Sequence, residues 1–164
     1  LIPVVEIVLG RVKNQEIADR AKSFYRCLQR IPIQIKKEIR GHLANRLTAA
    51  LYREAVYLIS EDVADVEDVD TVISNGPGLR LALLGPHMNY HLGGGEGGYR
   101  YYLEHLGPSQ EARWKTLGQT PLTPELKKKL IKGIEKQNIP MTELKTKRDD
   151  SLIEILKTKK SHGL

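Results

Sequence analysis

Two segments have the residue pattern of β-strands, and both lie within the first 37 residues of the chain. Residues 1–9 are almost entirely apolar and end at Gly10, and residues 31–37 alternate apolar and polar side chains over five positions. Between them, Asn14 can cap a helix that runs to about Arg30. This order favours a parallel pair of strands joined by a crossover helix. Because two strands alone are marginally stable in water, we expect the main sheet to lie upstream, in a longer protein.

From residue 38 onward the hydrophobic spacing favours helices. Apolar side chains at intervals of three or four mark a long amphipathic helix that ends near Ser60, namely Leu43, Leu47, Leu51, Ala55 and Leu58. Breakers at residues 75–78 and 85–86 interrupt the chain further on. The other predicted segments are a helix from about Asp65 to Asn75, a helix over 99–106, a turn or helix over 108–114, a helix from Thr123 to about Asn138, and a last helix from Thr142. The fold class is therefore mainly α, a helical module preceded by a strand–helix–strand unit.

The composition excludes several classes of protein. With 40% hydrophobic and 28% charged residues among 164, the chain is not disordered as a whole. Its apolar runs are far shorter than the roughly 20 residues of a membrane helix, so we expect no membrane segment. A single cysteine excludes an intramolecular disulfide and is compatible with a cytoplasmic location.

The net charge of +6 lies mainly in residues 121–164, which carry 11 Lys and Arg against 6 Asp and Glu. A basic segment of this kind can bind nucleic acid. Here six acids are interleaved and no aromatic side chain lies among the lysines, which favours a solvated helix face. We expect no nucleic-acid partner.

Two spacings resemble cofactor or metal motifs. Residues 93–98 satisfy G-x-G-x-x-G, but a dinucleotide loop must follow a strand and open a helix, and no strand precedes this one. A flexible or closely packed turn is favoured. His87 and His91 are four residues apart, with Glu96 nearby as a third possible ligand, yet the catalytic Glu of H-E-x-x-H is missing. Polar residues that line a cleft or a subunit contact are favoured over a metal site.

An aromatic group could bind a quaternary ammonium ion, because ring faces attract such cations. Ordinary helix packing is the alternative, and from the residues alone it is favoured. The members of this group are Tyr90, Tyr99, Tyr101, Tyr102 and Trp114.

Glu6 and Asn45 are the most informative polar residues. Glu6 is a carboxylate inside an apolar strand, where an unpaired charge is costly, so we expect it to have a partner such as a His. Asn45 lies near the start of the long helix and could hold a carbonyl or hydroxyl oxygen of a ligand. A salt bridge for Glu6 and a local cap for Asn45 are equally compatible with the sequence.

Three segments resemble the 3-hydroxyacyl-CoA dehydrogenase family, C-terminal domain, and most of all its branch with L-carnitine dehydrogenase and the lambda-crystallin proteins. These segments are Ile2–Val8, Lys37–Leu47, and Gly76–Arg80 followed by Gly85-Pro86. The resemblance implies three parts. Residues 1–37 would be the end of a Rossmann-type nucleotide-binding domain, residues 38–118 a helical domain for substrate binding and dimerisation, and residues 119–164 a helical extension.

The resemblance also implies an activity, the NAD-dependent oxidation of a 3-hydroxyl to a 3-keto group. In the family a catalytic His in a His-x-x-Asn-Pro motif precedes the strand that corresponds to residues 1–9. A family Glu that matches Glu6 pairs with that His, and a family Asn that matches Asn45 positions the substrate oxygen. Glu6 and Asn45 are therefore the predicted catalytic residues.

The chain departs from the family in two ways. The catalytic His and the nucleotide loop are absent, so we expect NAD to be bound by an upstream domain and the isolated fragment to be inactive. The family usually has Pro-Gly-Phe where this chain has Arg40-Gly41-His42, so the pocket entrance differs.

The substrate stays open between a 3-hydroxyacyl-CoA of fatty acid metabolism and L-carnitine. Basic residues such as Lys36, Lys37, Arg40 and Arg46 would suit the CoA phosphates, whereas the aromatic group would suit trimethylammonium. The candidate substrate-binding residues are Arg46, His87, Tyr90, His91 and Tyr102. We expect a homodimer, and the alternative function is a non-catalytic helical dimerisation or interaction module.

Overall fold

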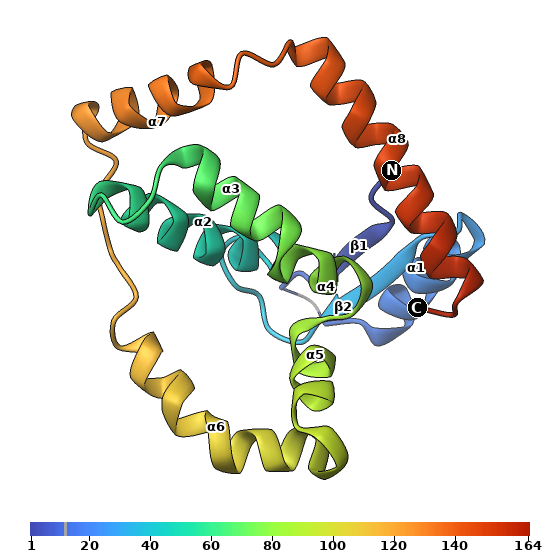
Figure 1. Cartoon of the computed structure of the whole chain (residues 1–164). Coiled ribbons are helices and arrows are strands. Elements are labelled where there is room, and N and C mark those ends of the chain that lie inside the picture. The colour runs from blue at the N-terminus through green and yellow to red at the C-terminus, as the bar shows by residue number, and fades with distance from the viewer. Residues whose placement is uncertain (12) are drawn as a thin grey trace. The chain divides into compact units, whose positions relative to one another are not determined.

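The structure is a computed structural model that describes residues 1–11 and 13–164, which form two compact units, residues 1–52 and 53–164 (Figure 1). It is 67% helical, so the mainly α fold class predicted from the sequence is confirmed. The predicted division into 1–37, 38–118 and 119–164 concerns the domains of the family and stays a prediction.

The first unit is built on a parallel strand pair. Strand β1 (Val4–Val8) pairs with β2 (Ile31–Ile35), and Glu6 lies opposite Ile33. Helix α1 (Gln15–Cys27) connects the two strands, and the Asn14 side chain accepts a hydrogen bond from Ile17 N at 3.2 Å. The predicted parallel pair, its crossover helix and the Asn14 cap are therefore confirmed.

The same unit holds the start of α2 (Ala44–Ser60), the long amphipathic helix that the leucine spacing predicts. The remaining helices belong to the second unit, and their bounds are α3 (Val66–Asn75), α4 (Pro77–Leu83), α5 (Pro86–Gly93), a 3₁₀ turn η1 (Gly95–Gly97), α6 (Gly98–Trp114), α7 (Pro124–Lys136) and α8 (Met141–Ser161).

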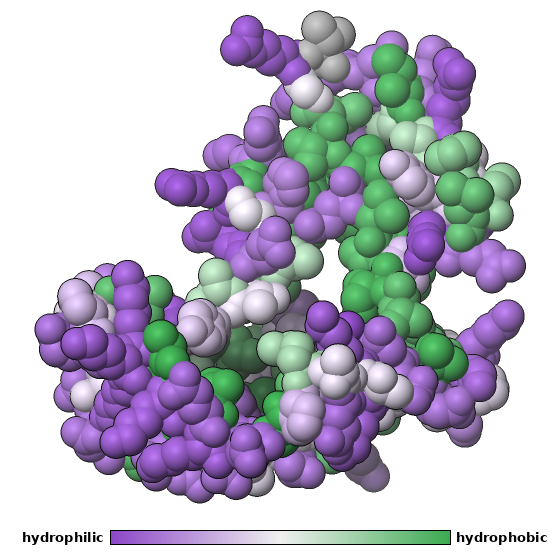
Figure 2. All heavy atoms as spheres, turned by 90° about the horizontal axis from the view of Figure 1, so that it is seen from above, coloured by the Kyte–Doolittle hydropathy of each residue, from purple (hydrophilic) through white to green (hydrophobic). Residues whose placement is uncertain are grey.

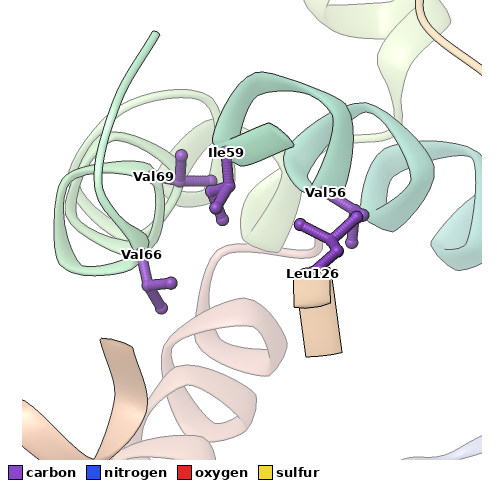
Figure 3. Packing of buried hydrophobic residues seen from close by; sticks show 5 residues of the cluster. All are labelled: Val56, Ile59, Val66, Val69 and Leu126. Carbon is purple, nitrogen blue, oxygen red and sulfur yellow. The ribbon is translucent and has the colours of Figure 1, made fainter. Parts of the chain in front are cut away.

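The second unit has a small apolar core. Val56 and Ile59 of α2 lie against Val66 and Val69 of α3, and Leu126 of α7 completes the cluster (Figure 3). Elsewhere many large apolar side chains stay exposed, and they form continuous green areas on the face seen in Figure 2. The core therefore uses only part of the apolar side chains that the described residues offer.

Three predicted boundaries are wrong. Helix α1 ends at Cys27 and not near Arg30, because Gln29 takes the left-handed conformation, with φ of 55°. The predicted break at residues 75–78 is a single residue, because α3 ends at Asn75 and Pro77 is already the first residue of α4. Only Gly76 lies between the two helices.

The third correction concerns α6, which runs through Pro108 without a break where the sequence predicts two segments. Proline removes one helical N–H and normally ends or kinks a helix. Here the Gln110 side chain donates a hydrogen bond to the Tyr102 hydroxyl, so a contact joins the turns on either side of Pro108. A contact of this kind stabilises the helix across the proline.

Candidate functional site

Glu6 lies at the start of helix α2. Its Oε1 accepts hydrogen bonds from the backbone N–H groups of Leu43, at 2.7 Å, and Ala44, at 3.2 Å. The Leu43 carbonyl accepts the first helical hydrogen bond, from Leu47 N at 3.0 Å. Helix N-termini carry unsatisfied N–H groups and a partial positive charge, so a carboxylate is stabilised there. Within residues 1–11 and 13–164, the group that Glu6 binds is therefore the beginning of a helix.

The turn in front of α2 has an unusual backbone. Gly41 and His42 both have positive φ, 82° and 49°, and His42 N donates to Ile39 O at 3.0 Å. A left-handed conformation is easy for glycine and costs energy for histidine. Such residues persist where the surrounding contacts hold them, and Glu6 provides contacts at the end of this turn.

Asn45 is the second residue of α2 and follows directly on Ala44. Its side chain is exposed, and within residues 1–11 and 13–164 its amide forms no hydrogen bond. Arg46 is the next residue and is also exposed. The structure thus brings the two predicted catalytic residues, Glu6 and Asn45, to the first turn of one helix, with Arg46 beside them.

A separate aromatic pocket of about 210 Å³ lies in the second unit, between α5 and α6. Tyr90 and Tyr102 stack with ring centroids 4.5 Å apart, and Tyr99 lies parallel to Tyr102 at 6.2 Å. The lining residues are Pro86, His87, Tyr90, Tyr99, Tyr102, Leu103, Gly107, Gln110 and Trp114. Four of the five aromatic residues singled out in the sequence therefore line this pocket. Tyr101 does not, because it stacks on His105 with centroids 3.9 Å apart.

Histidines 87 and 91 both contact Tyr99. The His87 ring nitrogen Nδ1 lies 2.9 Å from the Tyr99 hydroxyl, and His91 Nδ1 accepts a hydrogen bond from Tyr99 N, also at 2.9 Å. His87 lines the pocket, whereas His91 caps the start of α6. Within the described part of the chain, no group of three His, Cys, Asp or Glu side chains is placed to hold a metal ion.

The glycine-rich segment does not fit a dinucleotide. It forms a 3₁₀ turn between two helices, without the preceding strand that a pyrophosphate loop requires. Three of its glycines, Gly94, Gly97 and Gly98, leave no room for a side chain, and a Cβ at Gly98 would lie 2.7 Å from the His91 ring. The segment is therefore the closely packed turn that the sequence favours, and no cofactor chemistry is assigned to it.

Charge effects in the first unit are local. A hydrogen bond from Lys22, supported by one from Gln15, lowers the pKa of the Asp19 carboxyl on the exposed surface of α1. This carboxyl is part of a surface ion pair and not of the candidate site. Within residues 1–11 and 13–164, every helix is too short or too polar to cross a lipid bilayer.

Comparison with known proteins identifies the family. Residues 41–137 match the model of the 3-hydroxyacyl-CoA dehydrogenase, C-terminal domain, which covers more than half of the chain. The chain belongs to this family. The region matched by the family model includes Asn45, Arg46 and the aromatic pocket, while Glu6 lies before it.

Curated relatives of this family member include several L-carnitine dehydrogenases. The enzyme of Oceanobacillus iheyensis is 42% identical over 158 residues, which cover 95% of this chain and 52% of the relative. The enzyme of Pseudomonas putida is 35% identical over 170 residues, which cover 100% of this chain and 53% of the relative. The chain thus spans about half the length of the curated relatives it matches.

A solved structure shows the same fold. It is the crystal structure of 5-formyl-3-hydroxy-2-methylpyridine 4-carboxylic acid 5-dehydrogenase, an NAD⁺-dependent dismutase. The match has a TM-score of 0.71 at 22% identity and covers 97% of this chain and 52% of that one.

Proposed function

We propose that the chain is the C-terminal part of an NAD-dependent dehydrogenase that oxidises the 3-hydroxyl of a carnitine-like substrate to a 3-keto group. The observation that carries the proposal is that Glu6 is hydrogen-bonded to the start of α2, next to Asn45. The names of the curated relatives, at 35–42% identity over 94–100% of this chain, support the class of reaction and the substrate.

In this proposal Asn45 binds the reacting oxygen through its side-chain amide. Glu6 holds and orients the general base, a His supplied by an upstream segment, which takes the hydroxyl proton. NAD would be bound by an upstream nucleotide-binding domain, because the glycine-rich segment described here does not fit it.

The aromatic pocket supports a carnitine-like substrate. Tyrosine and tryptophan faces attract a trimethylammonium group, and none of the pocket residues carries a fixed positive charge that would repel it. His87, Tyr90 and Tyr102 are the proposed substrate-binding residues in this pocket. His91 would act indirectly, by capping α6 beside Tyr99.

A 3-hydroxyacyl-CoA is the second candidate substrate. Lys36, Lys37, Arg40 and Arg46 are all exposed, and they fall within eleven residues that lead into the first turn of α2. Such a group of cations suits the phosphates of CoA. Basic residues at this point of the chain are the feature that favours this alternative.

Helix α2 carries exposed apolar side chains that support an oligomeric protein. Leu47, Leu51 and Tyr52 of α2 are exposed by 66%, 47% and 57%. Exposed apolar side chains on one helix are typical of interaction surfaces, and we propose that the protein forms a homodimer. Sedimentation of the full-length protein as a monomer at micromolar concentration would contradict this.

The decisive experiment uses the protein expressed from its complete reading frame, with NADH absorbance followed for L-carnitine and, separately, for 3-hydroxybutyryl-CoA. We expect turnover with L-carnitine. Asn45→Ala should lower kcat/KM by about 10²-fold or more, because it removes a group that contacts the reacting oxygen. Asn75→Ala is the matched control, since Asn75 lies at the end of α3 with its amide bonded to Thr71 O, and it should change kcat/KM less than about threefold.

Absence of turnover with both substrates, in a protein shown to bind NAD, would contradict the proposed function. Preference for 3-hydroxybutyryl-CoA would show that the proposed substrate is wrong and that the proposed oxidation of a 3-hydroxyl is right. A protein that neither binds NAD nor turns over, but dimerises, would match the non-catalytic interaction module.

A further inference from the structure

We propose that Glu6 is a positioning residue for Asn45. Through one carboxylate oxygen it fixes the first turn of α2, and this sets the direction in which the Asn45 amide leaves the helix. The contact itself is structural, and its consequence for catalysis rests on the proposed function.

The first step is that Glu6, which binds the start of α2, lies on a strand that is itself held in place. Glu6 is the central residue of β1, where it lies opposite Ile33 in the parallel pair, and its side chain is half-buried. Its Oε1 accepts two hydrogen bonds, one from the backbone N–H of Leu43 at 2.7 Å and one from that of Ala44 at 3.2 Å. Hydrogen bonds to a charged acceptor are stronger than those between neutral groups. A strand residue therefore restrains the helix start at two adjacent backbone atoms.

The second step is that this helix start needs a restraint. The first turn of a helix has few internal hydrogen bonds and is the part that frays. Gly41 and His42 precede it with φ of 82° and 49°, and the left-handed conformation of His42 is unfavourable in itself. Without Glu6 this turn would relax toward other conformations. Asn45 lies three residues after His42, so its position depends on the turn.

The third step separates two roles of the same carboxylate. Oε1 is occupied by the helix, while within the part of the chain that the structure describes Oε2 accepts no hydrogen bond. Oε2 is thus available to the general base of the proposed mechanism. A glutamine at this position keeps an oxygen for Leu43 and Ala44 but loses the charge. An alanine at this position loses both the oxygen and the charge. An aspartate keeps the charge, but its side chain is one methylene too short to reach the N–H groups of Leu43 and Ala44.

The experiment uses the full-length protein and four variants, Glu6→Gln, Glu6→Ala, Glu6→Asp and the control Glu16→Gln, an exposed carboxylate in the first turn of α1. Selective ¹⁵N labelling of leucine, alanine and asparagine reports the amide protons of Leu43 and Ala44 and the side-chain NH₂ of Asn45. We expect Glu6→Ala and Glu6→Asp to raise amide exchange at Leu43 and Ala44 by about tenfold or more and to shift the Asn45 NH₂ signals. Glu6→Gln should retain most of the protection, and Glu16→Gln should change none of these signals.

The kinetic readout is the ratio of kcat/KM between Glu6→Gln and Glu6→Ala, measured with Asn45 in place and again with Asn45→Ala. Both Glu6 variants lack the charge that orients the general base, so this ratio isolates the contact with the start of α2. If Glu6 acts through Asn45, the ratio is much closer to one in the Asn45→Ala background. The same ratio in both backgrounds, well above one, would overturn the proposal. So would unchanged Leu43, Ala44 and Asn45 signals in a folded Glu6→Ala or Glu6→Asp protein. If the protein shows no dehydrogenase activity, the proposed function fails, while the amide signals still decide whether Glu6 positions Asn45.

Discussion

At Gly41 the backbone has a φ of 82°, in which an L side chain collides with its own peptide units. The space around it is sufficient, because a Cβ there would lie 3.6 Å from Arg46 N, at ordinary contact distance. Conformation and not crowding therefore determines which residue is accepted in the turn that leads into α2.

We expect Gly41→Ala to destabilise the protein by about 1–2 kcal/mol, the cost of a left-handed backbone for an L residue. Thermal or urea unfolding of the full-length protein measures this change. Gly10→Ala is the matched control from the same unit, since Gly10 has an ordinary φ and no atom within 4 Å of its Cβ position. Equal stabilities of the two variants would show that the left-handed turn is not formed in solution.

The partner of Glu6 could not be predicted from the sequence. A carboxylate in an apolar strand signals that a partner exists, but every residue except proline carries a backbone N–H, so the pattern cannot indicate which one donates. The N–H groups used belong to Leu43 and Ala44, which lie 37 and 38 residues further along the chain. By contrast, the Asn14 cap was predictable because its partner, Ile17, is three residues away.

At the scale of elements, local signals predict the helices that begin with a capping residue and follow one apolar stripe. Helices α1, α3 and α7 are of this kind, and Thr123 caps α7 by accepting from Leu126 N at 3.2 Å. Helix α2 is predicted by its apolar stripe alone, because the group that bonds to its first N–H groups is Glu6, which is distant in the sequence. Helices α4 and α5 were not predicted, since each is short and starts at a proline that also reads as a breaker. Helix α6 continues through Pro108, and the contact between Gln110 and Tyr102 that spans the proline has no local signature in the sequence.

Helix α7 packs on α3 through a glycine. A Cβ at Gly133 would lie 2.7 Å from Val66 Cβ and closer still to one of its methyl groups. In a helix, alanine is normally preferred to glycine by about 1 kcal/mol. Here the stiff, β-branched Val66 cannot turn aside easily, so we expect Gly133→Ala to destabilise the protein by about 1–3 kcal/mol.

Urea unfolding of the full-length protein checks this prediction, with Gly93→Ala as the control. Gly93 is the last residue of α5 and has no atom within 4 Å of its Cβ position, so alanine there should be neutral or slightly stabilising. A stabilising Gly133→Ala would mean that α7 does not pack on α3 as described.

At the scale of the whole molecule, the most basic segment contains a specific contact. Lys159 of α8 donates hydrogen bonds to the carbonyls of Ala82, at 2.8 Å, and Leu83, at 3.0 Å, at the end of α4. A cation is favourable at a helix C-terminus, where carbonyl groups lack helical partners. The basic segment is thus more than a solvated helix face at this residue.

We expect Lys159→Ala to increase amide hydrogen exchange throughout α8, by about threefold to tenfold, because it removes an anchor of that helix. Hydrogen-exchange mass spectrometry of the full-length protein measures the change. Lys160→Ala is the matched control, since Lys160 is adjacent and exposed, and it should leave exchange unaltered. Identical exchange in both variants would contradict a role for Lys159 in holding α8.

The contact between Glu6 and the start of α2 also constrains the order of events on the ribosome. Its donor lies 37 residues after Glu6, with α1 and β2 between them. Helix α1 can form from local interactions as soon as it emerges, and β2 can then pair with β1. The first turn of α2 receives its carboxylate only after that pairing has placed Glu6. During synthesis, the segment that carries Asn45 therefore acquires its final conformation last among the elements of its unit.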